Sequence, residues 1–298
     1  MTTIFPKGQF WSQVLRRAAR ARVTGALQPI ETQPEAIEED GIPFVLRVAV
    51  NLERKRVGGA DDVQRGVSPN PFLPYDPDLF VCDVSPTHFC LLNKFNVVDH
   101  HLLIATRHFE HQEDMLTFAD FEALWTCLAE VEGIGFYNSG PVAGASQAHK
   151  HLQLVPFPLG AGSEPFPFSR FFSVQEIQAS GRLRFLPFRH AIATLPPPAN
   201  DDPRIDAERA QAVYGLLLDA VGLAPMDVSQ AMRPSGSYNL LLTRDWIMIV
   251  PRSKECFESV SVNALGFTGS LFVRNREELQ RVIAHGPLSV LAEVGASW

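Results

Sequence analysis

Apolar residues recur at helical spacing close to the start of the chain. Phe10, Trp11, Val14, Leu15 and Ala18 form one stripe between polar positions. A stripe with this period predicts an amphipathic helix packed on the body of the protein. The first thirty residues are basic and contain no acidic residue, as in transit peptides, but they lack the apolar run of a signal peptide. We therefore expect a structural helix here.

The rest of the chain divides into segments that favour strands and segments that favour helices. Runs rich in Val, Leu and Phe predict strands over residues 44–52, 79–84, 88–93, 101–106, 135–137, 149–156, 238–243 and 246–251. Helices are predicted over residues 117–133, 206–222, 277–285 and 287–294. The acidic segment 25–41 is expected to be a loop. The strands do not alternate regularly with helices, which favours an α+β fold over a doubly wound parallel sheet.

A proline-rich segment suggests how the chain is organised. Three consecutive prolines begin at Pro196, and residues 200–203 continue the polar, proline-containing stretch. This composition is typical of a connection between packed regions. We therefore divide the chain into residues 1–195 and residues 196–298.

The overall composition is that of an ordinary globular protein. The chain has 298 residues, of which 46% are hydrophobic and 20% are charged. Its net charge of −7 argues against binding to nucleic acid, which requires a broad basic surface. No apolar run approaches the length needed to span a membrane, so we expect no membrane partner.

The cysteines indicate a reducing compartment. Cys82, Cys90, Cys127 and Cys256 are scattered and form neither a Cys-x-x-Cys pair nor a zinc-finger pattern. Free buried thiols of this kind are typical of cytoplasmic proteins. We therefore expect a cytoplasmic location.

The segment with the clearest chemical signal runs from Gly144 to Gln153 and contains two histidines and a glutamine at period two. In an extended strand alternate side chains share one face. His149, His151 and Gln153 therefore share a face, and Lys150 points to the opposite one. The pattern predicts a row of imidazole and amide groups directly after a loop of small residues.

This row suits a nucleophile that attacks phosphorus. Neutral histidine is nucleophilic at physiological pH, and its phosphoramidate product can be displaced by a second nucleophile. Phosphoryl transfer also needs groups that hold the phosphoryl oxygens. The loop residues Gly140, Gly144, Ala145, Ser146 and Gln147 could supply backbone N–H groups, a hydroxyl and an amide.

Gln153 favours transfer over hydrolysis. An amide can hydrogen-bond a phosphoryl oxygen or an imidazole but cannot shuttle a proton, whereas a third histidine could. An aprotic group at this position suits a good leaving group, such as a nucleoside polyphosphate, and an acceptor that is already an anion, such as phosphate. We therefore interpret the motif as the site of a two-step group transfer.

The paired histidines are also compatible with two roles that involve no nucleophile. They could be a chance pair of buried or surface residues, because a bare His-x-His-x-Gln match is only moderate evidence. They could also bind zinc if a third ligand converged on them in space, as Asp99, His100, His101 or His108 would allow. We expect no metal site, because no Cys or carboxylate lies near the pair at motif spacing.

The motif resembles the histidine-triad superfamily, in its branch with glutamine at the third position, and within it the diadenosine tetraphosphate phosphorylases, also called ATP adenylyltransferases. The resemblance covers nearly the whole chain. It rests on residues 25–30, 70–72, 92–95, 136–141, 144–153, 237–239, 250–253 and 263–267. It implies an α+β fold with a mostly antiparallel sheet flanked by helices in residues 1–195, and a C-terminal α+β lobe in residues 196–298 that completes the site.

The resemblance also implies roles for individual residues. His151 would be adenylylated during turnover, His149 would orient or polarise it, and Gln153 would contact the phosphoryl group. Substrate-binding positions would be Lys55, Asn93, Lys94, Asn138, Gly144, Ala145, Ser146, Gln147, Asn239 and Arg252. Lys55, Lys94 or Lys150 could balance the polyphosphate charge, although Lys150 points off the catalytic face.

The implied reaction is the phosphorolysis of diadenosine tetraphosphate to ATP and ADP. Its partners would be a nucleotide and inorganic phosphate, and the protein would act as a monomer. We expect Mg²⁺ to accompany the polyphosphate, because divalent ions offset such charge, and we expect no organic cofactor.

Competing functions follow from the same residues. Galactose-1-phosphate uridylyltransferases share His-x-His-x-Gln, but they usually have His-Pro-His and often metal-binding Cys spacing, whereas Lys150 fills the middle position here. A dinucleoside polyphosphate hydrolase, a related nucleotidyltransferase and a nucleotide sensor without turnover are the remaining alternatives.

Overall fold

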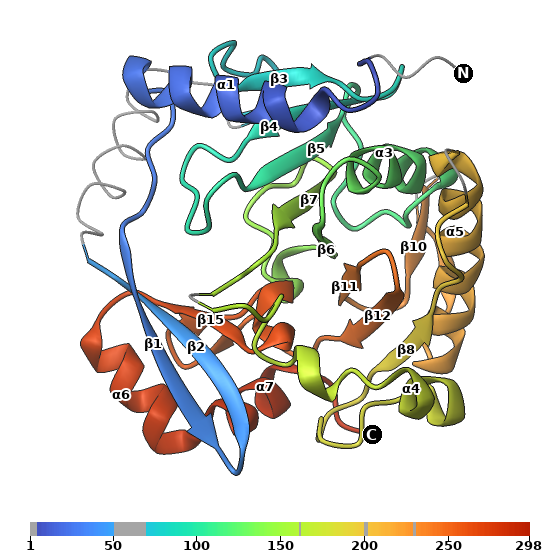
Figure 1. Cartoon of the computed structure of the whole chain (residues 1–298). Helices are drawn as coiled ribbons and strands as arrows, with labels where there is room; N and C mark the ends of the chain where they lie inside the picture. The colour runs from blue at the N-terminus through green and yellow to red at the C-terminus, as the bar shows by residue number, and fades with distance from the viewer. Residues whose placement is uncertain (1–4, 51–69, 161, 200–201, 229–230) are drawn as a thin grey trace.

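The computed structural model describes residues 5–50, 70–160, 162–199, 202–228 and 231–298 (Figure 1). An antiparallel sheet with the strand order β3-β4-β5-β7-β6-β11-β12-β8 forms its centre. The strands of this sheet are β3 (Phe80–Asp83), β4 (His88–Leu92), β5 (Leu102–Thr106), β6 (Gly133–Asn138), β7 (His151–Pro156), β8 (Ala191–Thr194), β11 (Tyr238–Leu242) and β12 (Trp246–Pro251). The predicted α+β class with a mostly antiparallel sheet is confirmed.

A smaller sheet combines strands from the N-terminal and C-terminal regions of the chain. It has the order β1-β2-β15, in which β1 (Thr32–Glu39) is antiparallel and β15 (Ser270–Val273) is parallel to β2 (Ile42–Ala49). Figure 1 shows β1 and β2 beside the C-terminal helices. Two short ribbons pair β9 (Pro225–Val228) with β10 (Ala231–Pro234), and β13 (Cys256–Phe257) with β14 (Val260–Ser261).

Helices and turns cover both faces of the central sheet. The helices are α1 (Phe10–Thr24), α3 (Phe118–Leu128), α4 (Val174–Ser180), α5 (Pro203–Ala220), α6 (Arg276–His285) and α7 (Pro287–Val294). Short 3-10 turns lie at η1 (Pro141–Ala143), η2 (Ser169–Phe171) and η3 (Ala264–Thr268). No helix in the described part of the chain combines the length and apolar character that crossing a bilayer requires.

Each face of the sheet has its own apolar core. Leu152 and Leu154 of β7 pack into a core that includes buried residues of α1, α3 and α5. Val155 points the other way, into a core that includes residues of β2, β15, α6 and α7. The alternation along β7 therefore directs His151 and Gln153 away from the α3 and α5 side.

Local signals explain where the predicted helices begin and end. Thr117 and Asp120 form a capping box at the start of α3. Pro203 follows the N-cap Asp202 of α5, and Gly25 ends α1 with a φ of 77°. Helix α3 ends earlier than predicted, because the chain from Gly133 onward pairs with β7 as strand β6.

The prediction of a loop over residues 25–41 is wrong, because Thr32–Glu39 forms β1 and pairs along its whole length with β2. This strand lies at the edge of its sheet and is mostly polar. Edge strands are commonly charged and tolerate proline, as at Pro34. The segment therefore lacks the apolar alternation that reveals a half-buried strand.

The central sheet crosses the boundary predicted at residues 195 and 196. Strand β8 precedes that boundary and pairs with β12, which follows it. Strand β11 pairs with β6, so the C-terminal region extends the same sheet. The division into two domains stays a prediction.

Candidate active site

The predicted catalytic residues lie where β7 begins, between β5 and β6. His151 pairs with Ala105, and Gln153 pairs with Leu103 and Phe136. His149 precedes the strand and forms an isolated bridge with His111. Strand β7 is therefore two residues shorter than predicted at this end.

One aromatic ring contacts both histidines. The Phe72 ring centre lies 5.4 Å from that of His149 and 5.2 Å from that of His151. Both imidazoles are therefore on the same side of the chain, as the period of two predicted. Phe72 is itself buried and packs with Ala105, the strand partner of His151.

The backbone fixes the orientation of the His151 ring. Its Nδ1 lies 2.8 Å from the carbonyl oxygen of His149, so Nδ1 carries the proton and donates it. No described residue hydrogen-bonds Nε2, which is left with its lone pair. Burial lowers the pKa of His151 to about 4, so the ring is neutral near pH 7. This is the protonation state that a nucleophile needs.

The His149 ring is occupied by other partners. Its Nε2 donates to the Thr106 carbonyl at 2.8 Å, and Asn70 Nδ2 donates to its Nδ1 at 3.0 Å. Burial lowers its pKa as well. Within the described structure His149 therefore acts on His151 through its backbone carbonyl. Its assignment as a catalytic residue stays a prediction.

A one-way chain of hydrogen bonds sets the orientation of Gln153. The Phe95 N–H donates to Asn93 Oδ1 at 3.2 Å, and Asn93 Nδ2 donates to His101 Nδ1, also at 3.2 Å. His101 Nε2–H then donates to Gln153 Oε1 at 2.8 Å. With Oε1 used as an acceptor, the Gln153 amide presents its N–H₂ group, for which no described residue provides a partner. The arrangement offers hydrogen-bond donors to an anion.

The sequence interpretation missed the part that His101 plays. It considered His101 only as a possible zinc ligand. Burial lowers the pKa of His101 to about 4, which keeps the ring neutral and able to accept from Asn93 while donating to Gln153. The only signal in the sequence is its place at the start of a predicted strand, and that does not identify its partner.

Low pH is expected to destabilise the protein through these two buried histidines. The pKa of His101 and of His151 is about 4 when folded and 6.5 ordinarily. Below pH 6.5 the unfolded chain therefore binds protons that the folded chain does not, and the free energy of unfolding falls. The expected loss is about 3 kcal/mol in total between pH 6.5 and pH 5.

Urea unfolding at several pH values in this window measures that loss. The variant His101→Asn removes one of the two groups, so its stability should depend less on pH. The surface variant His285→Ala should retain the full slope. A wild-type stability that stays flat from pH 6.5 to pH 5 would contradict the assignment.

Gln112 was also missed, and it lies between the ends of β6 and β7. The ladder between these strands stops at the pair Phe136 and Gln153. Beyond it, Gln112 Oε1 accepts the His151 N–H at 2.8 Å, and Nε2 donates to the carbonyls of Asn138 at 2.9 Å and His151 at 3.1 Å. The side-chain amide replaces a peptide group in the ladder. It holds the backbone of His151 apart from that of Asn138.

Replacing Gln112 should therefore impair His151 more than it impairs substrate binding. Gln112→Ala leaves buried backbone groups unpaired, which costs about 1–3 kcal/mol of stability. We expect kcat to fall about tenfold to hundredfold with a smaller change in KM, because the nucleophile is displaced. Gln112→Glu keeps the acceptor for His151 N–H but loses both donors, and should behave similarly. The surface variant Gln280→Ala serves as the control. If kcat is as high in Gln112→Ala and Gln112→Glu as in this control, the role assigned to Gln112 is refuted.

The small-residue loop after β6 offers fewer free N–H groups than predicted. The N–H groups of Gly140, Gly144 and Ala145 already donate to carbonyls at the end of β6 and within the η1 turn. Ser146 and Gln147 donate to no backbone carbonyl among the described residues. Gly144 has a φ of 88°, a conformation that favours glycine. Substrate contacts of this loop stay predictions.

Asn138, Asn239 and Arg252 form one buried cluster behind that loop. Asn138 Oδ1 accepts from Asn239 Nδ2 at 2.8 Å and from the Ala264 N–H at 3.0 Å. Asn239 Oδ1 accepts from Arg252 Nη1 at 2.6 Å, and both residues donate to the Ala143 carbonyl. Only Asn138 Nδ2 has no partner among the described residues and could reach a ligand. The other two residues position the loop.

The guanidinium of Arg252 is fully engaged. It donates to backbone carbonyls at Ala143, Lys254, Glu255, Val262 and Val294 in addition to Asn239. Burial lowers its pKa to about 10. Its predicted contact with substrate is untested, and the described hydrogen bonds already use its donors.

Lys150 cannot balance the charge of a substrate. Its Nζ lies 2.9 Å from a Glu110 oxygen, 3.1 Å from an Asp120 oxygen and 3.0 Å from the Met115 carbonyl. The side chain is fully buried on the face opposite His151. Asp120 also accepts from His88, and these contacts hold its pKa at about 2 despite burial. The suggestion that Lys150 balances polyphosphate charge is therefore wrong.

Lys94 and Lys55 are the other two lysines predicted to balance the polyphosphate charge. Lys94 follows Asn93 in the loop before β5, and its Nζ lies 5.4 Å from the Phe95 ring centre. It forms no ion pair with the residues that the structure describes. Lys55 lies outside the described residues.

The described residues contain no group of three or more His, Cys, Asp or Glu side chains placed to hold a metal ion. Two of the residues considered as zinc ligands have other partners. Asp99 accepts from Arg22 at 2.7 Å, and His101 binds Gln153. The neutral His151 ring, whose Nε2 has no described partner, and the Gln153 N–H₂ group support nucleophilic chemistry beside an amide donor.

Family models match nearly the whole chain. One, described as the Ap4A phosphorylase N-terminal domain, matches residues 1–174. A second, described as the ATP adenylyltransferase C-terminal domain, matches residues 184–297. The two matches follow one another along the chain, and the unmatched residues 175–183 lie between them.

Relatives and solved structures agree with these matches. The chain is 29% identical to the diadenosine 5',5'''-P1,P4-tetraphosphate phosphorylase 2 of Saccharomyces cerevisiae over 72% of this chain and 71% of that protein. It is also 29% identical to protein APA1 of the same yeast over 69% of this chain and 68% of that protein. The crystal structure of yeast Ap4A phosphorylase Apa2 superposes with a TM-score of 0.74 at 22% identity, covering 98% of both chains. A structure of that enzyme in complex with Ap4A gives a TM-score of 0.72 over 96% of this chain and 97% of the other.

Proposed function

Because the chain belongs to the Ap4A phosphorylase family of nucleotidyltransferases, we propose that it cleaves diadenosine tetraphosphate with inorganic phosphate to give ATP and ADP. The observation that carries this proposal is the pairing of two oriented groups. His151 leaves Nε2 without a described partner, and Gln153 turns its amide N–H₂ outward from the bond to His101. A nucleophile and an anion donor thus lie two residues apart on one strand face.

In the first step His151 Nε2 attacks the phosphorus next to one adenosine. The bond from that phosphorus to the bridging oxygen breaks, and ATP leaves with the oxygen and its electron pair. The new phosphorus–nitrogen bond gives adenylyl-His151, in which Nδ1 keeps its proton and its bond to the His149 carbonyl. The Gln153 N–H₂ group donates to a phosphoryl oxygen as charge develops there.

In the second step an oxygen of inorganic phosphate attacks the same phosphorus. The phosphorus–nitrogen bond breaks, ADP is released, and His151 returns to its neutral form. Gln153 cannot remove a proton from water, because an amide has no basic site of suitable pKa. Phosphate needs no such activation, since it is already an anion. This difference favours phosphorolysis over hydrolysis.

Further features of the reaction follow from charge. The described residues around His151 offer no set of metal ligands, so Mg²⁺ would arrive bound to the oxygens of the polyphosphate.

The four cysteines have no disulfide partners, in keeping with a reducing cytoplasm. We propose a cytoplasmic enzyme that acts as a monomer.

Isotope transfer tests the proposed reaction. The protein is incubated with diadenosine tetraphosphate and radiolabelled inorganic phosphate, and the products are separated. Phosphorolysis puts the label into ADP and leaves ATP unlabelled. Cleavage that proceeds equally without phosphate, with AMP as a product, would identify a hydrolase. Tight binding without cleavage would identify a nucleotide sensor.

A further inference from the structure

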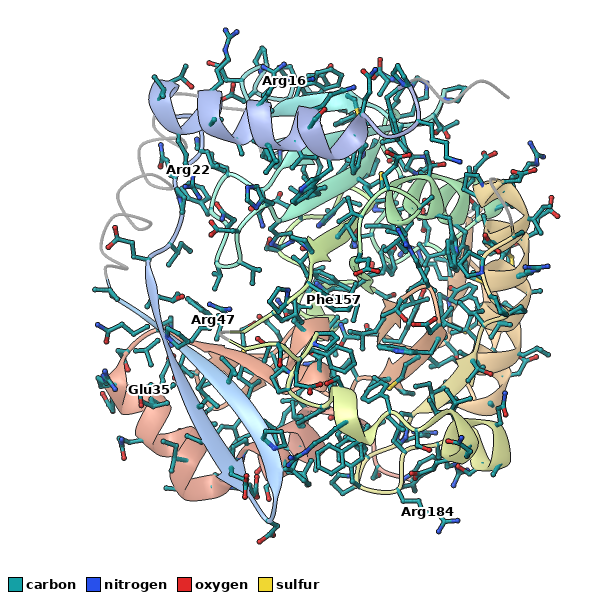
Figure 2. All side chains as sticks on the ribbon, viewed as in Figure 1. Arg16, Arg22, Glu35, Arg47, Phe157 and Arg184 are labelled. Atoms are coloured by element: carbon teal, nitrogen blue, oxygen red, sulfur yellow. The ribbon has the colours of Figure 1, made fainter. Side chains whose placement is uncertain are left out.

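Arg47 lies on β2, the middle strand of the small sheet. The residue beside it on β1 is Pro34 and the one beside it on β15 is Phe272, so its neighbours across the small sheet are not acidic. Its Nη2 donates to the carbonyl of Leu159, three residues beyond the end of β7. In Figure 2 Arg47 lies between the β1–β2 ribbon and Phe157, on the side away from α6.

The Arg47 charge lacks an acidic partner among the residues that the structure describes. Asp99 is near enough to raise its pKa, but the Asp99 carboxylate is bound by Arg22 at 2.7 Å. Arg47 Nε is buried and has no described hydrogen-bond partner. Burial of the guanidinium is the larger effect on its pKa, which is lowered. A buried donor of this kind costs free energy unless an acceptor completes it.

The two segments next to Arg47 both lead to catalytic groups. Asp99 is two residues before His101, which holds the Gln153 amide. Leu159 follows β7, which carries Gln153 itself. Arg47 is therefore on the Gln153 side of the site, the side opposite His149. A phosphate chain that starts at His151 and passes Gln153 would extend toward it.

Of the other cations considered for this task, two are committed elsewhere, one is not described, and Lys94 forms no ion pair with a described residue. Lys150 is buried in an ion-pair cluster, and Arg252 is saturated by carbonyls and an amide. Lys55 lies outside the described residues. Guanidinium groups bind phosphate through paired N–H donors, which a half-buried arginine can offer at fixed geometry.

We infer that Arg47 binds a phosphate group of the substrates through its guanidinium N–H donors, on the Gln153 side of the site. The inference rests on the proposed function, because that function identifies which substrate supplies the phosphate. That source is either the polyphosphate that leaves as ATP or the inorganic phosphate that attacks afterwards. Both present the same oxygens to Arg47.

The test compares Arg47→Gln and Arg47→Lys with the wild type and with the surface control Arg184→Gln. Calorimetry measures the affinity for ATP and, separately, for inorganic phosphate. We expect a loss of about tenfold to hundredfold for one of the two ligands in Arg47→Gln. Arg47→Lys should recover part of it, because it keeps the charge but not the paired donors. If ATP affinity falls, Arg47 binds the polyphosphate; if phosphate affinity falls, it binds the acceptor.

Stability and kinetics separate binding from a structural role. Arg47→Gln removes a charge without an acidic partner but also the hydrogen bond to the Leu159 carbonyl, so these opposing effects should leave the free energy of unfolding nearly unchanged. Turnover should then show a raised KM for the same ligand with a smaller change in kcat. Unchanged affinity for both ligands, or a clear fall in stability, would overturn the inference. Failure of the wild type to cleave would refute the proposed function, while the calorimetry would still decide on Arg47.

Discussion

Replacing His151 with alanine is expected to lower phosphorolysis of diadenosine tetraphosphate by about four to six orders of magnitude. The variant has no group at the position of Nε2, so the covalent route is closed. Only the contribution of binding and of donors such as Gln153 remains. Because His151 makes just one side-chain hydrogen bond among the described residues, to the His149 carbonyl, the fold should survive the change.

Two controls make this result interpretable. His151→Ala should still bind the dinucleotide, with an affinity near that of the wild type. His285→Ala removes a histidine on the surface of α6 and should retain full activity. Activity of His151→Ala within about tenfold of the wild type would show that another residue carries the reaction.

The second large effect is on stability. Lys150→Met should lower the free energy of unfolding by about 3–5 kcal/mol, because it leaves the buried Asp120 carboxylate without its lysine partner. Glu110 would lose less, since its side chain is partly exposed and can be solvated. Chemical denaturation of the purified variant measures the difference. The variant should retain the KM of the wild type at a temperature where it remains folded.

Lys94→Met provides the matched comparison. Lys94 forms no ion pair with any described residue, so its replacement should leave stability within about 0.5 kcal/mol of the wild type. If Lys94 balances polyphosphate charge, its loss should raise KM instead. The opposite pattern, with KM raised by Lys150→Met and stability lowered by Lys94→Met, would contradict the positions assigned to the two lysines.

Much of the fold could be predicted because the main helices and strands have clear patterns of apolar residues. The helical stripe beginning at Phe10 is long enough to reveal its period, and the continuous apolar runs of β4, β5, β11 and β12 indicate buried strands. Strand β1 could not be found this way, since its edge position allows a nearly polar sequence. Strand β8 has four residues, too few for a period to be recognised.

The strand face of the site was predictable, but the groups that orient it were not. Alternation alone places His151 and Gln153 on one face. The partners of these residues come from distant segments: His101 is 52 positions from Gln153, and Gln112 is 39 positions from His151. No local pattern encodes such pairs, because they depend on how β5, β6 and β7 are arranged in the sheet.

Charged residues were the hardest to place from the sequence. Lys150 is flanked by the two histidines, so its position in the motif suggested a substrate role that burial excludes. Arg47 is one polar residue in an apolar strand and drew no attention. Whether a cation is available to a ligand depends on its acidic neighbours, and those are set by the tertiary structure.

The central claim is that the reaction passes through adenylyl-His151, and trapping this intermediate tests it most directly. The protein is mixed with diadenosine tetraphosphate in the absence of phosphate, quenched at alkaline pH, and analysed by mass spectrometry of the intact chain and of its peptides. We predict one added adenylyl group per chain, located on His151, together with one released ATP. Subsequent addition of phosphate should remove the group as ADP. Release of ATP with no adduct, or an adduct on another residue, would contradict the account.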